Sequence, residues 1–114
     1  MPTKLIIGIT GLIASGKGTA ATYLKQKYGA SHYTFSTMLG DALDRFYLER
    51  NRDNFIKISE IIRGTFGKNT MAKTMAKDVE KDDNKIIVIE GVRRMADIEY
   101  LKEMEGFVLV EIFA

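Results

Sequence analysis

Hydrophobic residues in this chain fall into two alternating patterns. Short apolar runs at residues 4–9, 86–89 and 107–113 indicate buried strands, and a shorter segment at 32–35 indicates a further strand. The four consecutive branched residues at 86–89 are typical of a strand that is covered on both faces, as in a parallel sheet.

Between these runs, apolar residues recur at spacings of three or four, which predicts amphipathic helices. The expected stripes are Leu39, Leu43 and Phe46, then Phe55, Ile58, Ile62 and Phe66, and finally Met71, Met75 and Val79. The first helix is expected to start at Gly18 or Thr19, the second to be capped by Ser36 and the third by Asp53 or Asn54. The fourth is expected to open at Asn69 or Thr70. A fifth helix is expected over residues 95–105, with a cap near Asp97. Three of these helices are expected to end at Gly29, Gly67 and Gly106.

The alternation of strands and helices predicts an α/β fold. Right-handed crossovers between parallel strands place helices on both faces of the sheet, which gives a three-layer α/β/α sandwich. The chain has 114 residues and no low-complexity linker, so we expect one domain over residues 1–114.

Composition removes several classes of function. The chain has no cysteine, which excludes disulfides and thiolate metal sites, and a net charge of +2 does not by itself indicate nucleic acid. No apolar run approaches the roughly 20 residues that span a bilayer, and the first residues lack the pattern of a signal peptide. We therefore expect a cytoplasmic protein without a membrane partner.

A glycine-rich segment connects the first predicted strand to the first predicted helix. It runs from Gly11 through Ala14, Ser15 and Gly16 to Lys17, and continues with Gly18 and Thr19. Glycines let the backbone curl so that successive N–H groups and a helix N-terminus meet phosphate oxygens. Lys17 adds a mobile positive charge for the β- and γ-phosphates. The segment predicts a binding loop for a nucleoside triphosphate, with ATP as the expected ligand.

One position departs from the general phosphate-loop pattern. Gly18 follows Lys17 where a magnesium-binding Ser or Thr is usual, and Thr19 comes one residue later. The sequence GKGT resembles the loop of adenylate kinases and related nucleoside monophosphate kinases. The resemblance implies that Thr19 contacts the nucleotide phosphates and that magnesium is held largely through water. Thr19 is also a candidate contact for magnesium. The departure at Gly18 argues against a GTPase switch of the usual kind.

A carboxylate and two arginines follow the buried strand at 86–89. Glu90 stands at the carboxyl end of that strand, where ligands sit in open α/β sheets, and we expect it to orient magnesium-bound water. Arg93 and Arg94 are expected to neutralise charge during phosphoryl transfer. Residues 90–94 resemble the Asp-Gly-Phe-Pro-Arg segment of adenylate kinases, in which the arginine contacts substrate phosphates; either arginine is a candidate counterpart.

Residues 31–39 resemble the strand-to-helix segment that begins the monophosphate-binding region of the same superfamily, and Thr37 is the candidate contact there. The family's arginine at the start of this helix is replaced by Gly40, for which Arg45 and Arg63 are candidate substitutes. His32 is interpreted as a strand residue and not as a catalytic base.

The second predicted strand ends without an acid. Kinases that phosphorylate a hydroxyl need a base near the acceptor, and dephospho-coenzyme A kinases typically carry an aspartate at this place. A phosphate acceptor needs no base, which favours a nucleoside monophosphate, whereas Asp41 or Asp44 keeps dephospho-coenzyme A open.

Residues 4–114 as a whole resemble the first two-thirds of a small phosphate-loop kinase of the nucleoside monophosphate kinase and dephospho-coenzyme A kinase group, especially its microbial kinase-like ATPases. The resemblance implies the strand order 2-3-1-4, a helical acceptor-binding insertion at 36–81, and a missing C-terminal lid and last strand. It predicts transfer of the γ-phosphoryl of ATP, with Mg²⁺, to a small nucleotide-like acceptor.

Two other interpretations stay open at this stage. One is a nucleotide-binding regulatory module, or a truncated fragment, without turnover. The other is a protein- or RNA-binding face on 36–81, although nucleic acid is not the expected partner. The oligomeric state is left open.

Overall fold

The computed structural model describes residues 4–11 and 17–112 of the chain. The elements in chain order are β1 (Leu5–Gly11), α1 (Lys17–Tyr28), β2 (Ser31–Thr34), α2 (Phe35–Arg45), α3 (Arg52–Phe66), α4 (Thr70–Lys81), β3 (Ile86–Glu90), the 3-10 turn η1 (Met95–Ile98) and β4 (Phe107–Ile112).

The strands form one parallel sheet in the order β2-β3-β1-β4, which confirms the predicted α/β class and strand order. The register pairs Ile9 of β1 and Thr34 of β2 with Glu90 of β3. Because the strands are parallel, the carboxyl ends of β1, β2 and β3 meet at one edge of the sheet.

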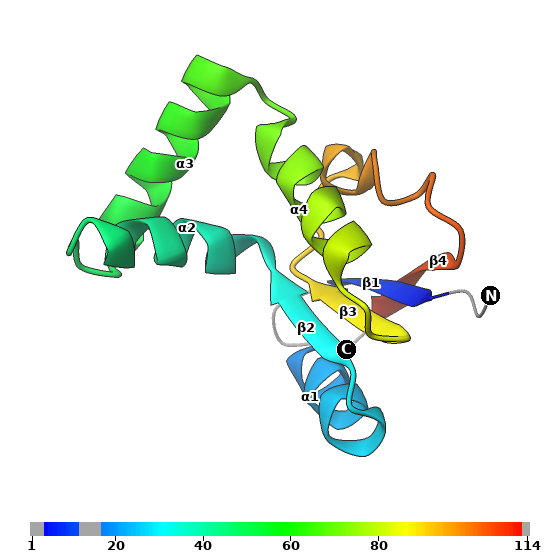
Figure 1. The fold of residues 1–114 in the computed structure, drawn as a ribbon. Coiled ribbons are helices and arrows are strands. Elements are labelled where there is room, and N and C mark those ends of the chain that lie inside the picture. The colour runs from blue at the N-terminus through cyan, green and yellow to red at the C-terminus, as the bar shows by residue number, and fades with distance from the viewer. Residues whose placement is uncertain (1–3, 12–16, 113–114) are drawn as a thin grey trace.

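Helices cover both faces of this sheet. Figure 1 shows α1 on one face and α4 with η1 on the other, while α2 and α3 extend sideways as a projecting arm. Side chains alternate accordingly along β3: Val88 packs toward α1, and Ile87 and Ile89 pack toward α4. All three side chains are fully buried, as the run of branched residues predicted.

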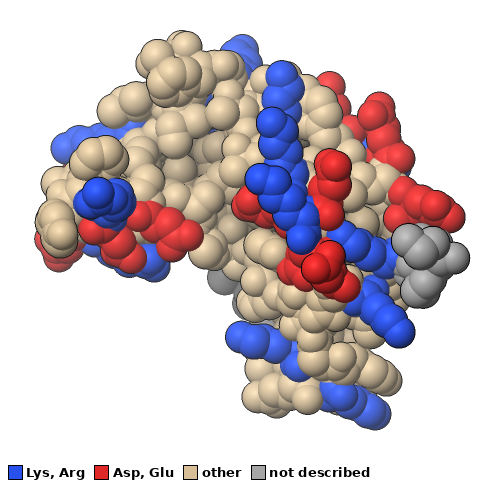
Figure 2. Space-filling view, in the orientation of Figure 1, with Lys and Arg blue, Asp and Glu red and all other residues tan. Residues whose placement is uncertain are grey.

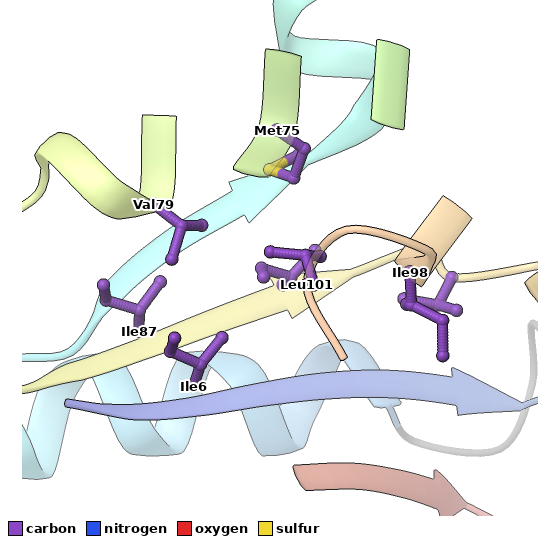
Figure 3. Packing of buried hydrophobic residues seen from close by; sticks show 8 residues of the cluster. Ile6, Met75, Val79, Ile87, Ile98 and Leu101 are labelled. Atoms are coloured by element: carbon purple, nitrogen blue, oxygen red, sulfur yellow. The ribbon is translucent and has the colours of Figure 1, made fainter. Parts of the chain in front are cut away.

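The larger core lies between the sheet and α4. Met75 and Val79 of α4 pack with Ile6, Ile98 and Leu101 (Figure 3). The predicted stripe on α4 is confirmed, since Met71, Met75 and Val79 are all buried. Asn69 is the N-cap of this helix, one of the two predicted starts.

The predicted helix over residues 95–105 is wrong. Only Met95–Ile98 is helical, as a single 3-10 turn, and turns occupy the residues up to Gly106. One turn is enough to place Ile98 and Leu101 in the core, after which the chain returns to begin β4. The left-handed φ of +87° at Gly106 allows that final turn.

Two predicted helix caps and two predicted stripe ends are also wrong. Thr34 caps α2 in place of the predicted Ser36, and Asn51 caps α3 in place of the predicted Asp53 or Asn54. In each cap a side-chain oxygen accepts a hydrogen bond from a backbone N–H group.

Phe46 is 70% exposed, because α2 has already ended at Arg45. Phe66 is 72% exposed, because α3 packs mainly against α2 and α4.

Candidate functional site

The predicted phosphate loop connects β1 to α1. β1 ends at Gly11 and α1 begins at Lys17, so the strand-then-helix context of the motif is confirmed. Ala14, Ser15 and Gly16 lie outside the described residues, as do the side chains of Gly11, Lys17, Gly18 and Thr19. The first turn of α1 carries no acidic residue, so nothing there opposes the affinity of a helix N-terminus for anions.

Glu90 lies at the carboxyl edge of the sheet, beside the end of β1. Its Oε2 accepts a hydrogen bond from Nε2 of His32 at 2.7 Å, and both side chains are mostly buried, with 18% and 24% exposed. No described residue hydrogen-bonds to Oε1. This second oxygen therefore has free acceptor capacity, which suits a carboxylate that orients metal-bound water.

The pairing of His32 with Glu90 was not foreseen from the sequence. Because side chains alternate along a strand, residues 32 and 34 share a face of β2, as residues 88 and 90 share a face of β3. The parallel register brings those two faces together. The signal was therefore present, but it required the strand order and the register.

The segment after β3 is held against the end of β1. Gly91 turns the chain with φ of +83°, and Oγ1 of Thr10 donates to the carbonyl of Val92 at 2.7 Å. Asp97 then fixes the backbone of the two arginines. Its Oδ2 accepts from the N–H groups of Arg93 and Arg94 at 3.0 and 3.1 Å, and the residue is only 8% exposed.

A cleft of about 440 Å³ opens between this segment and the arm. Its lining residues are Thr34, Phe35, Ser36, Leu39, Phe55, Ile56, Ser59, Arg63, Met71, Gly91, Arg93, Arg94 and Asp97. Three of the candidate arginines, at positions 63, 93 and 94, thus come together from α3 and from the segment after β3. The lining also includes apolar side chains, among them two phenylalanines, Phe35 and Phe55.

Arg63 has an unusual environment within this cleft. One guanidinium nitrogen, Nη1, donates to Oγ of Ser59, one turn earlier on α3. Its Nε is buried and has no hydrogen-bond partner. A buried N–H without a partner costs free energy, so this edge of the guanidinium has unused donor capacity in the wall of the cleft.

Two other predicted acceptor contacts lie elsewhere. The hydroxyl of Thr37 is 2.7 Å from the hydroxyl of Thr34, and its backbone N–H donates to the same atom, so Thr37 belongs to the cap of α2. Arg45 is exposed in the last turn of α2. Neither is among the described lining residues of the cleft, whereas Ser59, Phe55 and Asp97 are, although the sequence did not indicate them.

A family model described as an AAA domain matches residues 10–113. The chain belongs to this AAA-domain family. Among curated relatives, a UPF0200 protein of Sulfurisphaera tokodaii is 30% identical over 108 residues, covering 94% of this chain and 58% of the relative. A UPF0200 protein of Hyperthermus butylicus is 22% identical over 111 residues, covering 97% and 59%.

Solved structures share the fold of this AAA-domain chain. A putative kinase from Chloroflexus aurantiacus matches with a TM-score of 0.60 at 17% identity, covering 100% of this chain and 60% of that one. Shikimate kinase from Acinetobacter baumannii matches with a TM-score of 0.55 at 15% identity, covering 99% and 58%. The chain has the fold of these two structures, and it spans under two-thirds of the length of these relatives and structures.

Charge on the AAA domain is mixed in sign. Figure 2 shows a column of basic side chains over α4, with acidic side chains beside it. The exposed lysines of α4 are Lys73, Lys77 and Lys81. In the described part of the chain, no three His, Asp or Glu side chains form a metal-binding group, and no helix is long and apolar enough to cross a membrane.

Proposed function

We propose that this AAA-domain protein binds ATP with Mg²⁺ and transfers the γ-phosphoryl group to a small nucleotide-like acceptor in the cleft, with a nucleoside monophosphate favoured. The observation that carries the proposal is the convergence of Arg63, Arg93 and Arg94 on one cleft beside the end of β1. Phosphoryl transfer needs positive charge around the transferring oxygens, and guanidinium groups supply it with bidentate geometry.

The donor would bind on the loop between β1 and α1. In this scheme Lys17 and the backbone amides from Gly11 to Thr19 hold the triphosphate, as the motif and its strand-then-helix context support. Magnesium, when bound, would neutralise charge on the β- and γ-phosphate oxygens. Glu90 would orient its water through Oε1, and Thr19 is a further candidate for contact with it.

The acceptor would bind in the cleft between α3 and the segment after β3. The lining combines three cationic groups with apolar side chains that include Phe35, Leu39 and Phe55. An aromatic base with an attached phosphate presents both an apolar ring and an anion, which suits a lining of this composition. Arg63, Arg93 and Arg94 would receive the phosphate.

The carboxylates near the cleft support a phosphate as acceptor over a hydroxyl. Asp97 is the one carboxylate among the described lining residues, and its Oδ2 is already engaged with two backbone N–H groups. Asp41 and Asp44 both pair with Arg50 on the outer part of the arm. None of the three is placed as a free general base, whereas an ionised phosphate acceptor requires none.

The first test is ATP binding measured by isothermal titration calorimetry. Lys17→Ala should weaken ATP affinity by about 10-fold or more, the scale of one lost charge-assisted hydrogen bond. Lys25→Ala is the matched control, because Lys25 is exposed at the far end of the same helix. Equal affinities for the wild type and Lys17→Ala would mean that the loop does not hold the phosphates.

The second test is a coupled assay of ADP release with nucleoside monophosphates and dephospho-coenzyme A as acceptors. We expect turnover with a nucleoside monophosphate. Tight ATP binding without turnover on any of these acceptors would overturn the kinase assignment and favour a nucleotide-binding regulatory module.

A further inference from the structure

His32 is the one histidine of the chain, and the proposed chemistry does not use it. It lies on β2, the outer strand of the sheet, whereas the phosphate loop follows β1, two strands away. Its ring nonetheless reaches Glu90 on the intervening strand, with Nε2 2.7 Å from Oε2. This contact links a strand far from the triphosphate to the carboxylate assigned to magnesium.

The contact determines which carboxylate oxygen of Glu90 stays available. Oε2 is taken by the imidazole, while no side chain or backbone group that the structure describes hydrogen-bonds to Oε1. A carboxylate on a flexible side chain that is held at one oxygen loses rotational freedom before any ligand arrives. Groups hydrogen-bonded to a metal-orienting carboxylate commonly set its direction, and losing one typically weakens metal affinity by about 10- to 100-fold.

We propose that His32 is a positioning residue for magnesium, which holds Glu90 through Oε2 and leaves Oε1 to receive metal-bound water. This inference rests on the proposed function, because it assumes that Glu90 serves Mg²⁺·ATP. It goes beyond that function by giving a role to an outer-strand residue that contacts no phosphate in the scheme. His32 acts through Glu90 and takes no part in proton transfer.

The proposal is tested by measuring ATP binding with and without Mg²⁺. His32→Leu removes the hydrogen-bonding nitrogen but keeps a side chain of similar bulk on the strand. We expect it to raise the Mg²⁺ concentration that gives half of the maximal increase in ATP affinity by about 10-fold. The affinity for ATP in the presence of EDTA should stay within about 2-fold, since no phosphate contact is lost.

A conservative variant separates positioning from packing. The amide of glutamine can place an N–H donor close to the position of Nε2, so His32→Gln should restore most of the Mg²⁺ dependence. The shorter amide of His32→Asn should fall short of Glu90 and behave as His32→Leu does, and it provides a second loss-of-contact variant if His32→Leu does not fold. In a Glu90→Gln background, His32→Leu should add nothing further, because the two residues act as one unit.

The outcomes distinguish this inference from the proposed function. A wild-type protein that does not bind ATP, or whose ATP affinity is unaffected by Mg²⁺, overturns the proposed function and this inference with it. A wild type with Mg²⁺-enhanced binding, and a folded His32→Leu with an unchanged Mg²⁺ requirement, overturns only the role of His32. Equal loss in His32→Gln and His32→Leu likewise overturns it, since the donor would then be irrelevant.

Discussion

The guanidinium of Arg50 lies directly against Gly40. A Cβ at residue 40 would lie 2.8 Å from Cζ of Arg50, closer than such atoms approach one another. Arg50 is held in this position by Asp44, with Nε to Oδ1 at 2.9 Å and Nη2 to Oδ2 at 2.6 Å. The lack of a side chain at Gly40 therefore makes room for Arg50. That arginine is bound to Asp44 and is not a cleft residue.

Gly40→Ala should show opposing effects on stability. Alanine in the interior of α2 gains about 1 kcal/mol of helix propensity over glycine, but its Cβ displaces Arg50. In an Asp44→Asn background, Arg50 is no longer held as firmly and can move aside. Chemical denaturation should therefore show that Gly40→Ala is more stabilising in Asp44→Asn than in the wild type. Equal effects in both backgrounds would show that Arg50 does not crowd residue 40.

Arg63 is expected to set acceptor affinity without affecting ATP. Arg63→Lys keeps a positive charge but removes Nε and the planar fork, so affinity for the acceptor phosphate should fall by about 10-fold or more. Ser59→Ala frees Nη1 and should cause a smaller loss in the same direction. The measurement is titration with a nucleoside monophosphate and, separately, with ATP.

Lys57→Ala provides the control for that comparison. Lys57 is an exposed cation on the same helix and does not line the cleft. A loss in Lys57→Ala as large as that in Arg63→Lys would indicate a general effect of charge on α3 and would contradict a specific contact at residue 63.

Asp97 should matter both for stability and for the acceptor site. Asp97→Ala leaves the backbone N–H groups of Arg93 and Arg94 without their acceptor, and a partly buried unpaired donor costs about 1–3 kcal/mol. Denaturant unfolding should show a loss of this size, together with weaker acceptor binding. Asp97→Asn keeps one acceptor oxygen and should lose less stability than Asp97→Ala. An Asp97→Ala variant as stable as the wild type would mean that water replaces the carboxylate without a cost in free energy.

The pair formed by Tyr33 and Asp82 predicts a loss of stability at high pH. The phenol donates to Oδ2 at 2.6 Å, and burial, assisted by this hydrogen bond and the charge of Asp82, raises the pKa of Tyr33 to about 12. Below pH of about 10 the phenol is neutral in both the folded and the unfolded chain. Between about 10 and 12 only the unfolded chain ionises, so the free energy of unfolding falls as the pH rises.

Tyr33→Phe should remove this component of the pH dependence. Thermal unfolding of the wild type and the variant at pH 9, 10.5 and 11.5 should show that the difference between them shrinks as the pH rises. Tyr47→Phe, at a residue that is 91% exposed, should follow the wild type. A constant difference between wild type and Tyr33→Phe would mean that Tyr33 ionises alike in both states.

The buried segments and their order along the chain could be predicted from the sequence, because each is marked by a pattern of hydrophobic residues within a few positions. The run of Ile87, Val88 and Ile89 predicted a strand covered on both faces, and the four-residue spacing of Met71, Met75 and Val79 predicted the inner stripe of α4; both are buried as expected. The helix expected over 95–105 was wrong for a related reason. The apolar residues there have a spacing that is compatible with a helix. In the structure a single turn, Met95–Ile98, suffices to bring Ile98 and then Leu101 into the core, after which the chain has to reach the start of β4.

The residues of the candidate site also divide into those that could be predicted from local pattern and those that could not. The phosphate-loop motif and the positions of Glu90, Arg93 and Arg94 follow from residues that are near in sequence, because a loop after one strand and a carboxylate at the end of another meet at the same edge of a parallel sheet. Nothing local could relate Ser59 and Arg63 of α3 to Arg94, or distinguish Arg63 from Arg45.

Hydrophobic periodicity and backbone chemistry act over a few residues, so the parallel α/β class and the phosphate-loop motif between the first strand and helix could be predicted from the chain alone. Which charged groups lie next to one another depended on how the elements pack in the folded chain. The sheet register joined His32 to Glu90, and the packing of the arm brought Arg63 to the cleft and took Arg50 to Asp44. Such pairings depend on contacts between residues far apart along the chain, for which local pattern carries no information.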